Sequence, residues 1–379
     1  MKKLLKRFLQ SLPAWTLRNY IVFESAPDCS DNTRAVFDEM IRRGLNKKYK
    51  MIWLIKDQRH AIDGIKNVKC VPASSRARRR YVLQAKCLVS CNQKLHSYRK
   101  GQYSIYLGHG MPVKSLRVAS PAVSENITNW LSMSSKMTEI FSYEFNMPAK
   151  QSVSLGYPRN DEFYRSRVDL HHLFDVDFDK IVVWYPTFRQ NHGGISASDS
   201  DIALPVIHNE QNAIALNEFA KQQKLLIVLK PHFAQDVSCL LNLNLPYIKF
   251  INDEFLFDNH ISSYQFVNGC DALLTDYSSI YFDFLITNRP IGLTWEDYDD
   301  YAKRPGFAID MDDYMAGGEK IYTQKDLIDF LTRVVNGQDD LKNERARICQ
   351  LIQQHHDGQS ARRVVDFILQ NLSTKSKKG

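Results

Sequence analysis

One histidine of this chain lies where a general base could act. His109 sits between Gly108 and Gly110, directly after the apolar run 104–107. Glycines let a ligand approach the backbone closely, and an imidazole titrates near neutral pH. These properties suit a base that removes a proton from a hydroxyl. The same pattern also fits a turn histidine that only satisfies a backbone group, and the local sequence leaves both readings open.

A second histidine follows another apolar run. His232 comes after Lys230 and Pro231, where the run 225–229 ends. Proline restricts the backbone, so His232 has a fixed direction. Its imidazole could donate a hydrogen bond to a phosphate oxygen. A solvated loop histidine is the alternative.

Small hydroxyl residues gather between two further apolar stretches, 272–274 and 280–285. Their order indicates a strand, a tight turn and a helix. The N–H groups at a helix start are unpaired and the helix dipole favours an anion there, so the turn suits a phosphate; ordinary N-capping is compatible with this. The candidate residues are Thr275, Asp276, Ser278 and Ser279.

Two arginines also follow predicted breaks in the chain. Arg189 ends the sequence Pro-Thr-Phe-Arg after the apolar run 181–185, and Arg159 lies within Gly-Tyr-Pro-Arg-Asn-Asp at 156–161. A guanidinium can hold a phosphate through two parallel hydrogen bonds. The alternative for each arginine is an ion pair between domains.

The elements that must position these residues alternate between strands and helices. The predicted strands are continuous apolar runs, typical of strands buried on both faces of a parallel sheet. Amphipathic segments at 33–43, 209–223 and 277–287 lie between them, which indicates α/β architecture. The predicted strands are 20–23, 51–55, 68–71, 87–90, 104–107, 181–185, 225–229, 247–251, 272–275 and 290–294.

Two groups of five strands predict two Rossmann-like domains, with a boundary near 156–167. We expect an N-terminal domain over 1–160, a C-terminal domain over 161–350, and a C-terminal helix with a basic tail over 351–379. In such sheets ligands bind beyond the carboxyl ends of the strands. The candidate residues above all follow predicted strands or the boundary.

Composition narrows the class of protein. The chain has 379 residues, 44% hydrophobic and 24% charged, which excludes a disordered, collagenous or coiled-coil protein. The seven cysteines are odd in number and scattered, so we expect reduced thiols. We also expect no signal peptide. The sequence contains no stretch of about 18 apolar residues, so we expect no membrane-spanning helix. No spacing supports a metal site, His355 and His356 included.

The net charge of +8 is unevenly distributed. Residues 1–120 contain 25 Lys+Arg and 7 Asp+Glu, whereas the remainder is acidic. Residues 1–12 place leucines and Phe8 opposite Lys2, Lys3, Lys6 and Arg7, as in a helix that lies on an anionic leaflet. That helix could equally pack on its own domain. A cluster of arginines at 76–80 is most often a solvated face, although it could meet an anionic polymer or lipid.

Together these motifs resemble the CDP-glycerol glycerophosphotransferase family, which includes teichoic-acid primases and polymerases and relatives in capsule synthesis. The resemblance covers roughly residues 20–370. Two departures lie beside the histidines: Met111 replaces the family's Thr, and Phe233 replaces a frequent Pro. The motifs are at 21–25, 31–34, 109–114, 156–161, 186–189, 230–232, 271–284, 289–290, 298–301, 306–307 and 357–360.

The resemblance implies a GT-B-like α/β fold, with two Rossmann-like domains facing a central cleft, and a peripheral enzyme at the cytoplasmic face of the membrane. The donor would be CDP-glycerol or CDP-ribitol, the acceptor a teichoic-acid-like or capsular polymer, possibly lipid-linked, and CMP the leaving group. It implies no tightly bound cofactor and no protein-bound metal, and leaves a need for free Mg²⁺ open.

The same resemblance gives roles to the candidate residues. His109 would be the base, and His232 would act with Thr275, Ser278 and Ser279 on the diphosphate. Asp276 would orient the turn, Arg159 and Arg189 would bind phosphate, and Lys114 would bind the acceptor. The alternative is a GT-B sugar-nucleotide glycosyltransferase, for which no carboxylate suited to a hexose is evident. A nucleic-acid-binding protein would need a reader motif that the chain lacks.

Overall fold

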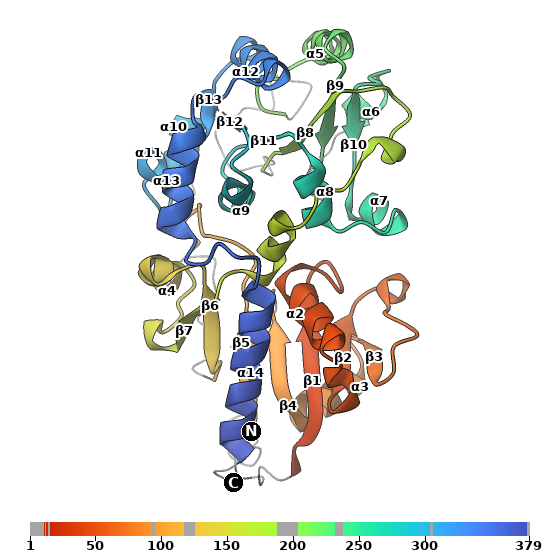
Figure 1. Ribbon diagram of the computed structural model, residues 1–379, viewed down its shortest axis with the longest axis vertical. Helices are drawn as coiled ribbons and strands as arrows, with labels where there is room; N and C mark the ends of the chain where they lie inside the picture. Colours follow the sequence, from red (N-terminus) through yellow and green to blue (C-terminus); the bar gives the residue numbers. More distant parts are fainter. Residues whose placement is uncertain are drawn as a thin grey trace. The chain divides into compact units, whose positions relative to one another are not determined.

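The computed structural model describes residues 11, 13, 16–92, 95–116, 126–187, 204–231, 238–303 and 306–376. The chain divides into two compact units, each built around a parallel sheet (Figure 1). Unit 1 comprises residues 1–109, 117–164 and 353–379, and unit 2 comprises residues 110–116 and 165–352. The first division of the chain therefore falls directly after His109.

Unit 1 contains a seven-stranded sheet in the order β3-β2-β1-β4-β5-β6-β7. Every neighbouring pair is parallel. The order reverses between β1 and β4, which is where ligands bind in doubly wound sheets. The strands are β1 (Arg18–Glu24), β2 (Lys50–Ile55), β3 (Val68–Pro72), β4 (Ala85–Ser90), β5 (Tyr103–Tyr106), β6 (Asn129–Ser132) and β7 (Ser152–Ser154).

Alternation along β1 distributes the core of unit 1 over both faces of the sheet. Val22 belongs to a cluster with Val82 of helix α3 (Arg76–Gln84). The next residue, Phe23, contacts Phe37 of helix α2 (Asp31–Arg42), with ring centroids 5.6 Å apart. Successive side chains of a strand point to opposite faces, so α2 and α3 cover opposite faces of this sheet.

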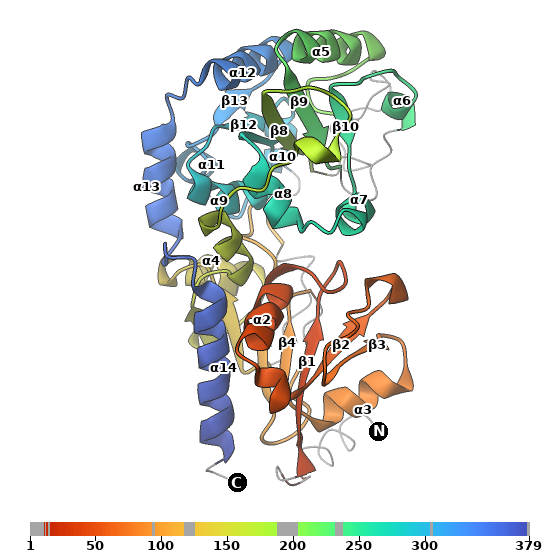
Figure 2. The same ribbon diagram turned by 45° about the vertical axis from the view of Figure 1, so that its right-hand side comes forward.

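The last helix of the chain, α14 (Ser360–Ser376), returns to unit 1. Figures 1 and 2 both show it beside α2. The Asp161 carboxylate accepts hydrogen bonds from the backbone N–H groups of Ser360 and Ala361, both at 2.8 Å, and so caps the start of α14. A β-carbon on Gly156 would lie 2.4 Å from Ser360 Oγ. Helix α4 (Thr138–Glu144) and a 3₁₀ segment over Pro158–Tyr164 complete the unit.

Unit 2 repeats the same winding with six parallel strands, in the order β10-β9-β8-β11-β12-β13. Its order reverses between β8 and β11, so the ends of these two strands are the corresponding ligand position. The strands are β8 (Lys180–Tyr185), β9 (Leu225–Leu229), β10 (Ile248–Phe250), β11 (Ala272–Thr275), β12 (Ile291–Thr294) and β13 (Glu319–Ile321).

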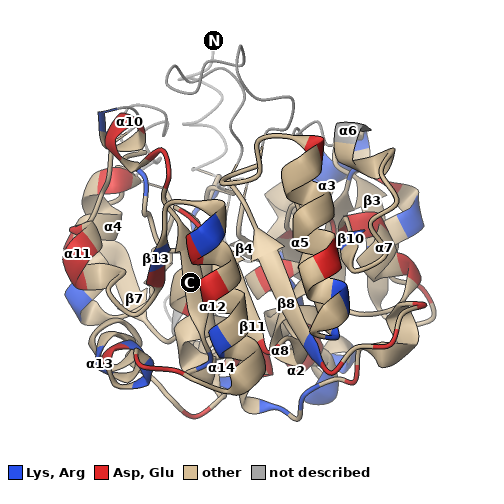
Figure 3. Cartoon of the chain, turned by 90° about the horizontal axis from the view of Figure 1, so that it is seen from above, with Lys and Arg blue, Asp and Glu red and all other residues tan. Residues whose placement is uncertain are grey.

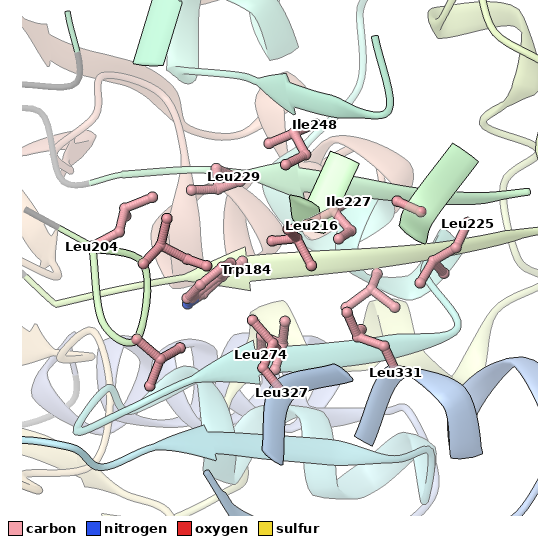
Figure 4. Close-up of a cluster of buried hydrophobic side chains, with 14 of the residues drawn as sticks. Trp184, Leu204, Leu216, Leu225, Ile227, Leu229, Ile248, Leu274, Leu327 and Leu331 are labelled. Atoms are coloured by element: carbon pink, nitrogen blue, oxygen red, sulfur yellow. The ribbon is translucent and has the colours of Figure 1, made fainter. Parts of the chain in front are cut away.

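One face of this sheet packs on α5 (Glu210–Gln222) and α12 (Gln324–Asn336). Trp184 lies at the centre of this core, with Leu216 of α5 and Leu327 of α12 around it (Figure 4). The outer surfaces of α5 and α12 carry charges of both signs, as expected of solvated faces (Figure 3). The remaining helices are α6 (Ser238–Leu241), α7 (Asp253–Asp258), α8 (Ser263–Gly269), α9 (Ile280–Phe284), α10 (Tyr298–Lys303), α11 (Met311–Tyr314) and α13 (Lys342–Ile352).

All ten predicted strands are present, with ends that differ by two residues or fewer. The two groups of five strands were wrong, because the sheets contain seven and six strands. The strands that were missed, β6, β7 and β13, each contain polar residues and form no continuous apolar run. The helix predicted from residue 277 begins at Ile280 and continues as a 3₁₀ turn over Leu285–Thr287. The helix predicted within 351–379 is α14, and it extends as far as Ser376.

Candidate functional site

His109 lies just beyond the carboxyl end of β5 and is exposed. Its Nδ1 is 3.3 Å from the carbonyl oxygen of Cys91, the first residue after β4. A carbonyl oxygen only accepts, so Nδ1 carries the proton in this hydrogen bond. In the neutral ring the lone pair is then on Nε2, the nitrogen that a general base would use.

The Cys91 side chain takes no part in nucleophilic chemistry here. Burial raises the pKa of its thiol well above the usual value, and the negative charge of Asp31 acts in the same direction. The thiol therefore stays protonated near neutral pH. Cys91 contributes its backbone carbonyl to the site rather than its sulfur.

The loops around His109 are joined to one another. Glu24 ends β1, and its carboxylate accepts a hydrogen bond from the backbone N–H of Asn92 at 3.2 Å. The Asn92 side chain in turn accepts from the N–H of Ala26 at 2.8 Å. These bonds connect the chain after β1 with the chain after β4, the two strands at which the sheet order reverses. The sequence analysis did not single out Asn92, although its place directly after a strand was a usable signal.

Arg159 lies in the same unit as His109 and is buried there. Its Nη1 donates to both carboxylate oxygens of Asp31, at 2.9 and 3.0 Å, and to the carbonyl oxygen of His109 at 2.9 Å. This ion pair lies within unit 1, because Asp31 belongs to the same unit. Phosphate binding by Arg159 stays a prediction.

Unit 2 brings the chain after β8 to the turn after β11. Asp276 accepts hydrogen bonds from the backbone N–H of Thr187, at 2.8 Å, and from its hydroxyl. It also accepts from the N–H of Tyr277 at 2.6 Å. Asp276 is fully buried, so it orients the turn as the sequence analysis expected.

The hydroxyl residues of this turn differ in their surroundings. Thr275 is fully buried, and its hydroxyl donates to the carbonyl oxygen of Tyr185 at 2.9 Å. Ser278 and Ser279 are half-buried, and their hydroxyls make no hydrogen bond to the described residues. The serines are therefore available to a ligand, whereas Thr275 holds the ends of β8 and β11 together.

Lys114 lies in unit 2 rather than with His109 in unit 1. It forms an antiparallel bridge with Phe307, and its Nζ is 5.7 Å from the centre of the Tyr301 ring. Tyr301 stacks on Tyr277 with ring centroids 4.1 Å apart. The lysine predicted to bind the acceptor thus belongs to the same unit as the turn residues Thr275, Asp276, Ser278 and Ser279, which are predicted to bind the donor.

Two carboxylates that the sequence analysis missed follow β12. Glu296 is 3.0 Å from Nε2 of His208, and Asp297 accepts a hydrogen bond from the Tyr277 hydroxyl at 2.9 Å. These carboxylates lie at an edge where the sequence analysis found none suited to a hexose, and whether they contact a sugar is untested. Their position directly after a predicted strand was a signal that could have found them.

The remaining predictions fall outside the described residues or are untested by them. His232 and Arg189 lie outside the described ranges, as do residues 1–10 and Leu12 of the predicted amphipathic helix. Among the residues that the structure describes, no three His, Cys, Asp or Glu side chains group as metal ligands would. That the protein binds no metal stays a prediction.

The sequence and the fold were compared with known proteins. The sequence model of the family described as CDP-Glycerol:Poly(glycerophosphate) glycerophosphotransferase matches residues 5–370. A teichoic acid glycerol-phosphate transferase of Staphylococcus aureus is 24% identical over 96% of this chain and 95% of its own length. A teichoic acid glycerol-phosphate primase of Bacillus subtilis is 26% identical over 52% of this chain.

The solved structure of the wall teichoic acid polymerase TagF superimposes with a TM-score of 0.73 and 22% identity, over 99% of this chain and 93% of that one. This likeness confirms the predicted α/β, GT-B-like fold with two Rossmann-like units. The chain spans about half the length of the first two curated relatives that it matches, 46% and 57%. The chain belongs to the CDP-glycerol:poly(glycerophosphate) glycerophosphotransferase family.

Proposed function

We propose that this protein is an enzyme that transfers glycerol phosphate, or a related polyol phosphate, from a CDP-activated donor to a hydroxyl of a teichoic-acid-like or capsular polymer and releases CMP. The observation that carries the proposal is the hydrogen bond between His109 Nδ1 and the Cys91 carbonyl, at 3.3 Å. It holds the exposed ring in the tautomer that a base requires, beyond the carboxyl edge of a doubly wound sheet. Family membership supplies the reaction class.

In the proposed reaction the acceptor hydroxyl attacks the phosphorus atom that bears the polyol. The new oxygen–phosphorus bond forms as the bond to the bridging diphosphate oxygen breaks, and CMP leaves with that electron pair. His109 Nε2 takes the proton of the hydroxyl. Such transfers depend mostly on positioning and on neutralising charge.

The donor would be held by the turn after β11. Ser278 and Ser279 are half-buried hydroxyls without partners among the described residues, so they can donate to the diphosphate. Asp276 keeps this turn fixed against Thr187. His232 and Arg189 remain candidates for the same diphosphate, and Lys114 for the acceptor.

A donor panel tests this proposal. The full chain is incubated with CDP-glycerol, CDP-ribitol, UDP-glucose or UDP-N-acetylglucosamine, each with a short glycerol phosphate oligomer as acceptor. Released nucleotides are separated by chromatography. We expect CMP from one or both CDP-polyols and no UDP from the sugar nucleotides. UDP release without CMP would instead support a sugar-nucleotide glycosyltransferase.

We also infer that the protein acts at an anionic membrane surface, with the exposed side of α3 toward the lipid. Arg76, Arg79 and Arg80 are exposed and Arg78 is half-buried. No acidic side chain pairs with any of them in the described part of the chain. The only acidic residue from 58 to 106 is Asp63. No described helix has the length and apolarity needed to cross a membrane.

Vesicle flotation tests the membrane proposal. At low salt, the full chain should float with phosphatidylglycerol vesicles and not with phosphatidylcholine vesicles, and high salt should weaken binding. Replacing Arg76, Arg79 and Arg80 by Gln removes attraction of about 1 kcal/mol per cation. The matched control replaces the exposed Lys221, Lys303 and Lys342 of unit 2 by Gln. Equal flotation of both triple variants would exclude α3 as the contact surface.

A further inference from the structure

We infer that Asp31, Asn32 and Arg159 form a clamp that fixes the Gly108–His109 peptide, and that these three side chains are positioning residues for the base. The inference rests on the proposed function, because it takes His109 as the proton acceptor. It gives Arg159 a role other than phosphate binding.

The clamp holds two consecutive carbonyl groups. Arg159 Nη1 donates to the carbonyl oxygen of His109 at 2.9 Å, and Asn32 Nδ2 donates to that of Gly108 at 3.0 Å. The two holding residues are also bonded to each other, since the backbone N–H of Arg159 donates to Asn32 Oδ1 at 3.1 Å. The Asp31 carboxylate accepts hydrogen bonds from the same Arg159 Nη1, at 2.9 and 3.0 Å.

The local backbone cannot hold His109 in place by itself. Gly108 has φ 64° and Gly110 has φ 147°, so the residues on both sides occupy the region that suits glycine. Glycine has the widest choice of backbone conformations, and His109 is exposed and so lacks packing that would fix it. A base must be placed within about 0.5 Å of its productive position. The clamp supplies this precision from residues far away in the sequence.

The burial of the clamp separates it from an ordinary surface ion pair. The Arg159 and Asp31 side chains are 7% and 15% exposed. Helix α2 also carries an exposed pair, Arg34 and Asp38, at 2.8 Å, with side chains 44% and 54% exposed. Asp38 lies about two turns beyond Asp31 on this helix. Asp38→Asn is therefore a matched control for Asp31→Asn on the same helix.

Three variants test the clamp: Asp31→Asn, Asn32→Ala and the control Asp38→Asn. Asparagine tolerates the φ of 60° at position 31, so the first change removes charge without adding backbone strain. We expect kcat for CMP release to fall by about 10- to 10²-fold in Asp31→Asn and Asn32→Ala, as for a misplaced catalytic group. Asp38→Asn should match the wild type. Calorimetric affinity for CDP should be unchanged in all three.

A double variant distinguishes positioning from general damage. If Asp31 acts through His109, then adding Asp31→Asn to His109→Ala should cause no further loss of kcat. A multiplicative loss in the double variant would overturn the inference, as would wild-type kcat in both Asp31→Asn and Asn32→Ala. Loss of CDP affinity in Asp31→Asn would overturn it in favour of direct donor contact by Arg159. If Asp31→Asn does not fold, Asn32→Ala carries the same test.

NMR of the His109 ring tests the clamp without measuring enzyme activity. Its result therefore does not depend on whether the proposed function is correct. In protein labelled with ¹⁵N-histidine, the His109 ring signals are assigned by their absence in His109→Ala. They should shift or broaden in Asp31→Asn and stay in place in Asp38→Asn. Unchanged signals in Asp31→Asn would contradict the clamp. A wild-type protein that releases no nucleotide would contradict the proposed function while leaving this comparison valid.

Discussion

Asp276 accepts hydrogen bonds from both the backbone N–H and the hydroxyl of Thr187. Thr187 follows β8 and Asp276 follows β11, so this buried carboxylate joins the two strands at which the order of the second sheet reverses. The turn that carries Ser278 and Ser279 is therefore held by its first residue. This arrangement can present hydroxyls to a ligand without using the carboxylate that fixes them.

The double change Ser278→Ala with Ser279→Ala should weaken binding of CDP and CDP-glycerol. Each lost hydrogen bond to a charged diphosphate should cost roughly 1.5–3 kcal/mol, and the backbone N–H groups that remain will limit the total. Isothermal titration calorimetry measures this directly. The control is Ser166→Ala, an exposed serine of the same unit. Wild-type affinity in the double variant would place the diphosphate elsewhere.

Replacing His109 by Ala should abolish most transfer while the fold stays intact. The expected loss is about 10²–10⁴-fold in turnover, the usual contribution of a general base. Steady-state CMP release and thermal unfolding are measured together. His172→Ala, which removes an exposed histidine of unit 2, should leave both unchanged. Turnover of His109→Ala near the wild-type rate would remove His109 from the mechanism.

Gly156→Ala should destabilise the attachment of α14. The position has φ 78°, and a β-carbon there would lie 2.4 Å from Ser360 Oγ. The strain and the clash together should lower the free energy of unfolding by about 1–3 kcal/mol. Gly64→Ala is the matched control, because Gly64 has φ 75° and nothing within 4 Å of the added carbon. Equal losses in urea unfolding would show that the contact with Ser360 contributes nothing.

Cys70 should be the most reactive of the described cysteines, and its alkylation should increase with pH around neutrality. A hydrogen bond from the Cys29 side chain lowers the pKa of the Cys70 thiol to about 7, although partial burial opposes this. A lowered pKa means that the thiolate already predominates above about pH 7. Cys29, Cys87, Cys91, Cys270 and Cys349 are buried.

Iodoacetamide labelling followed by mass spectrometry gives the midpoint for Cys70. In Cys29→Ala, which removes the hydrogen bond, the midpoint should move up toward the usual pKa of a thiol, about 8.5. A midpoint that is the same in both proteins would mean that Cys29 does not set the reactivity of Cys70.

The sequence predicted the strands, the helices and the residues of single loops well. It predicted poorly which strands and residues contact each other in the fold. Apolar runs located ten strands, and glycines around position 109 identified a histidine on a strand end. Strands such as β7 (Ser-Val-Ser) and β13 (Glu-Lys-Ile) are mostly polar, so no apolar run marked them. Periodicity also says nothing about which strands are neighbours.

The sequence also could not predict which residues far apart in the chain contact each other, because periodicity describes only local structure. Asp31 and Arg159 are 128 positions apart, and no local pattern links them. Lys114 follows His109 by five residues, yet it pairs with Phe307 in the other unit. The motif at 109–114 therefore contributes residues to both units. Its sequence alone did not indicate this division.

The most direct test of the account is ³¹P NMR of the complete reaction. The wild-type protein is mixed with CDP-glycerol, or separately CDP-ribitol, and a glycerol phosphate oligomer, with His109→Ala in a parallel sample. The account predicts that the diphosphate signals disappear while CMP and new phosphodiester signals appear in equal amounts, and that His109→Ala reacts far more slowly. Diphosphate signals that persist with both donors, or CMP formed without any new phosphodiester, would contradict it.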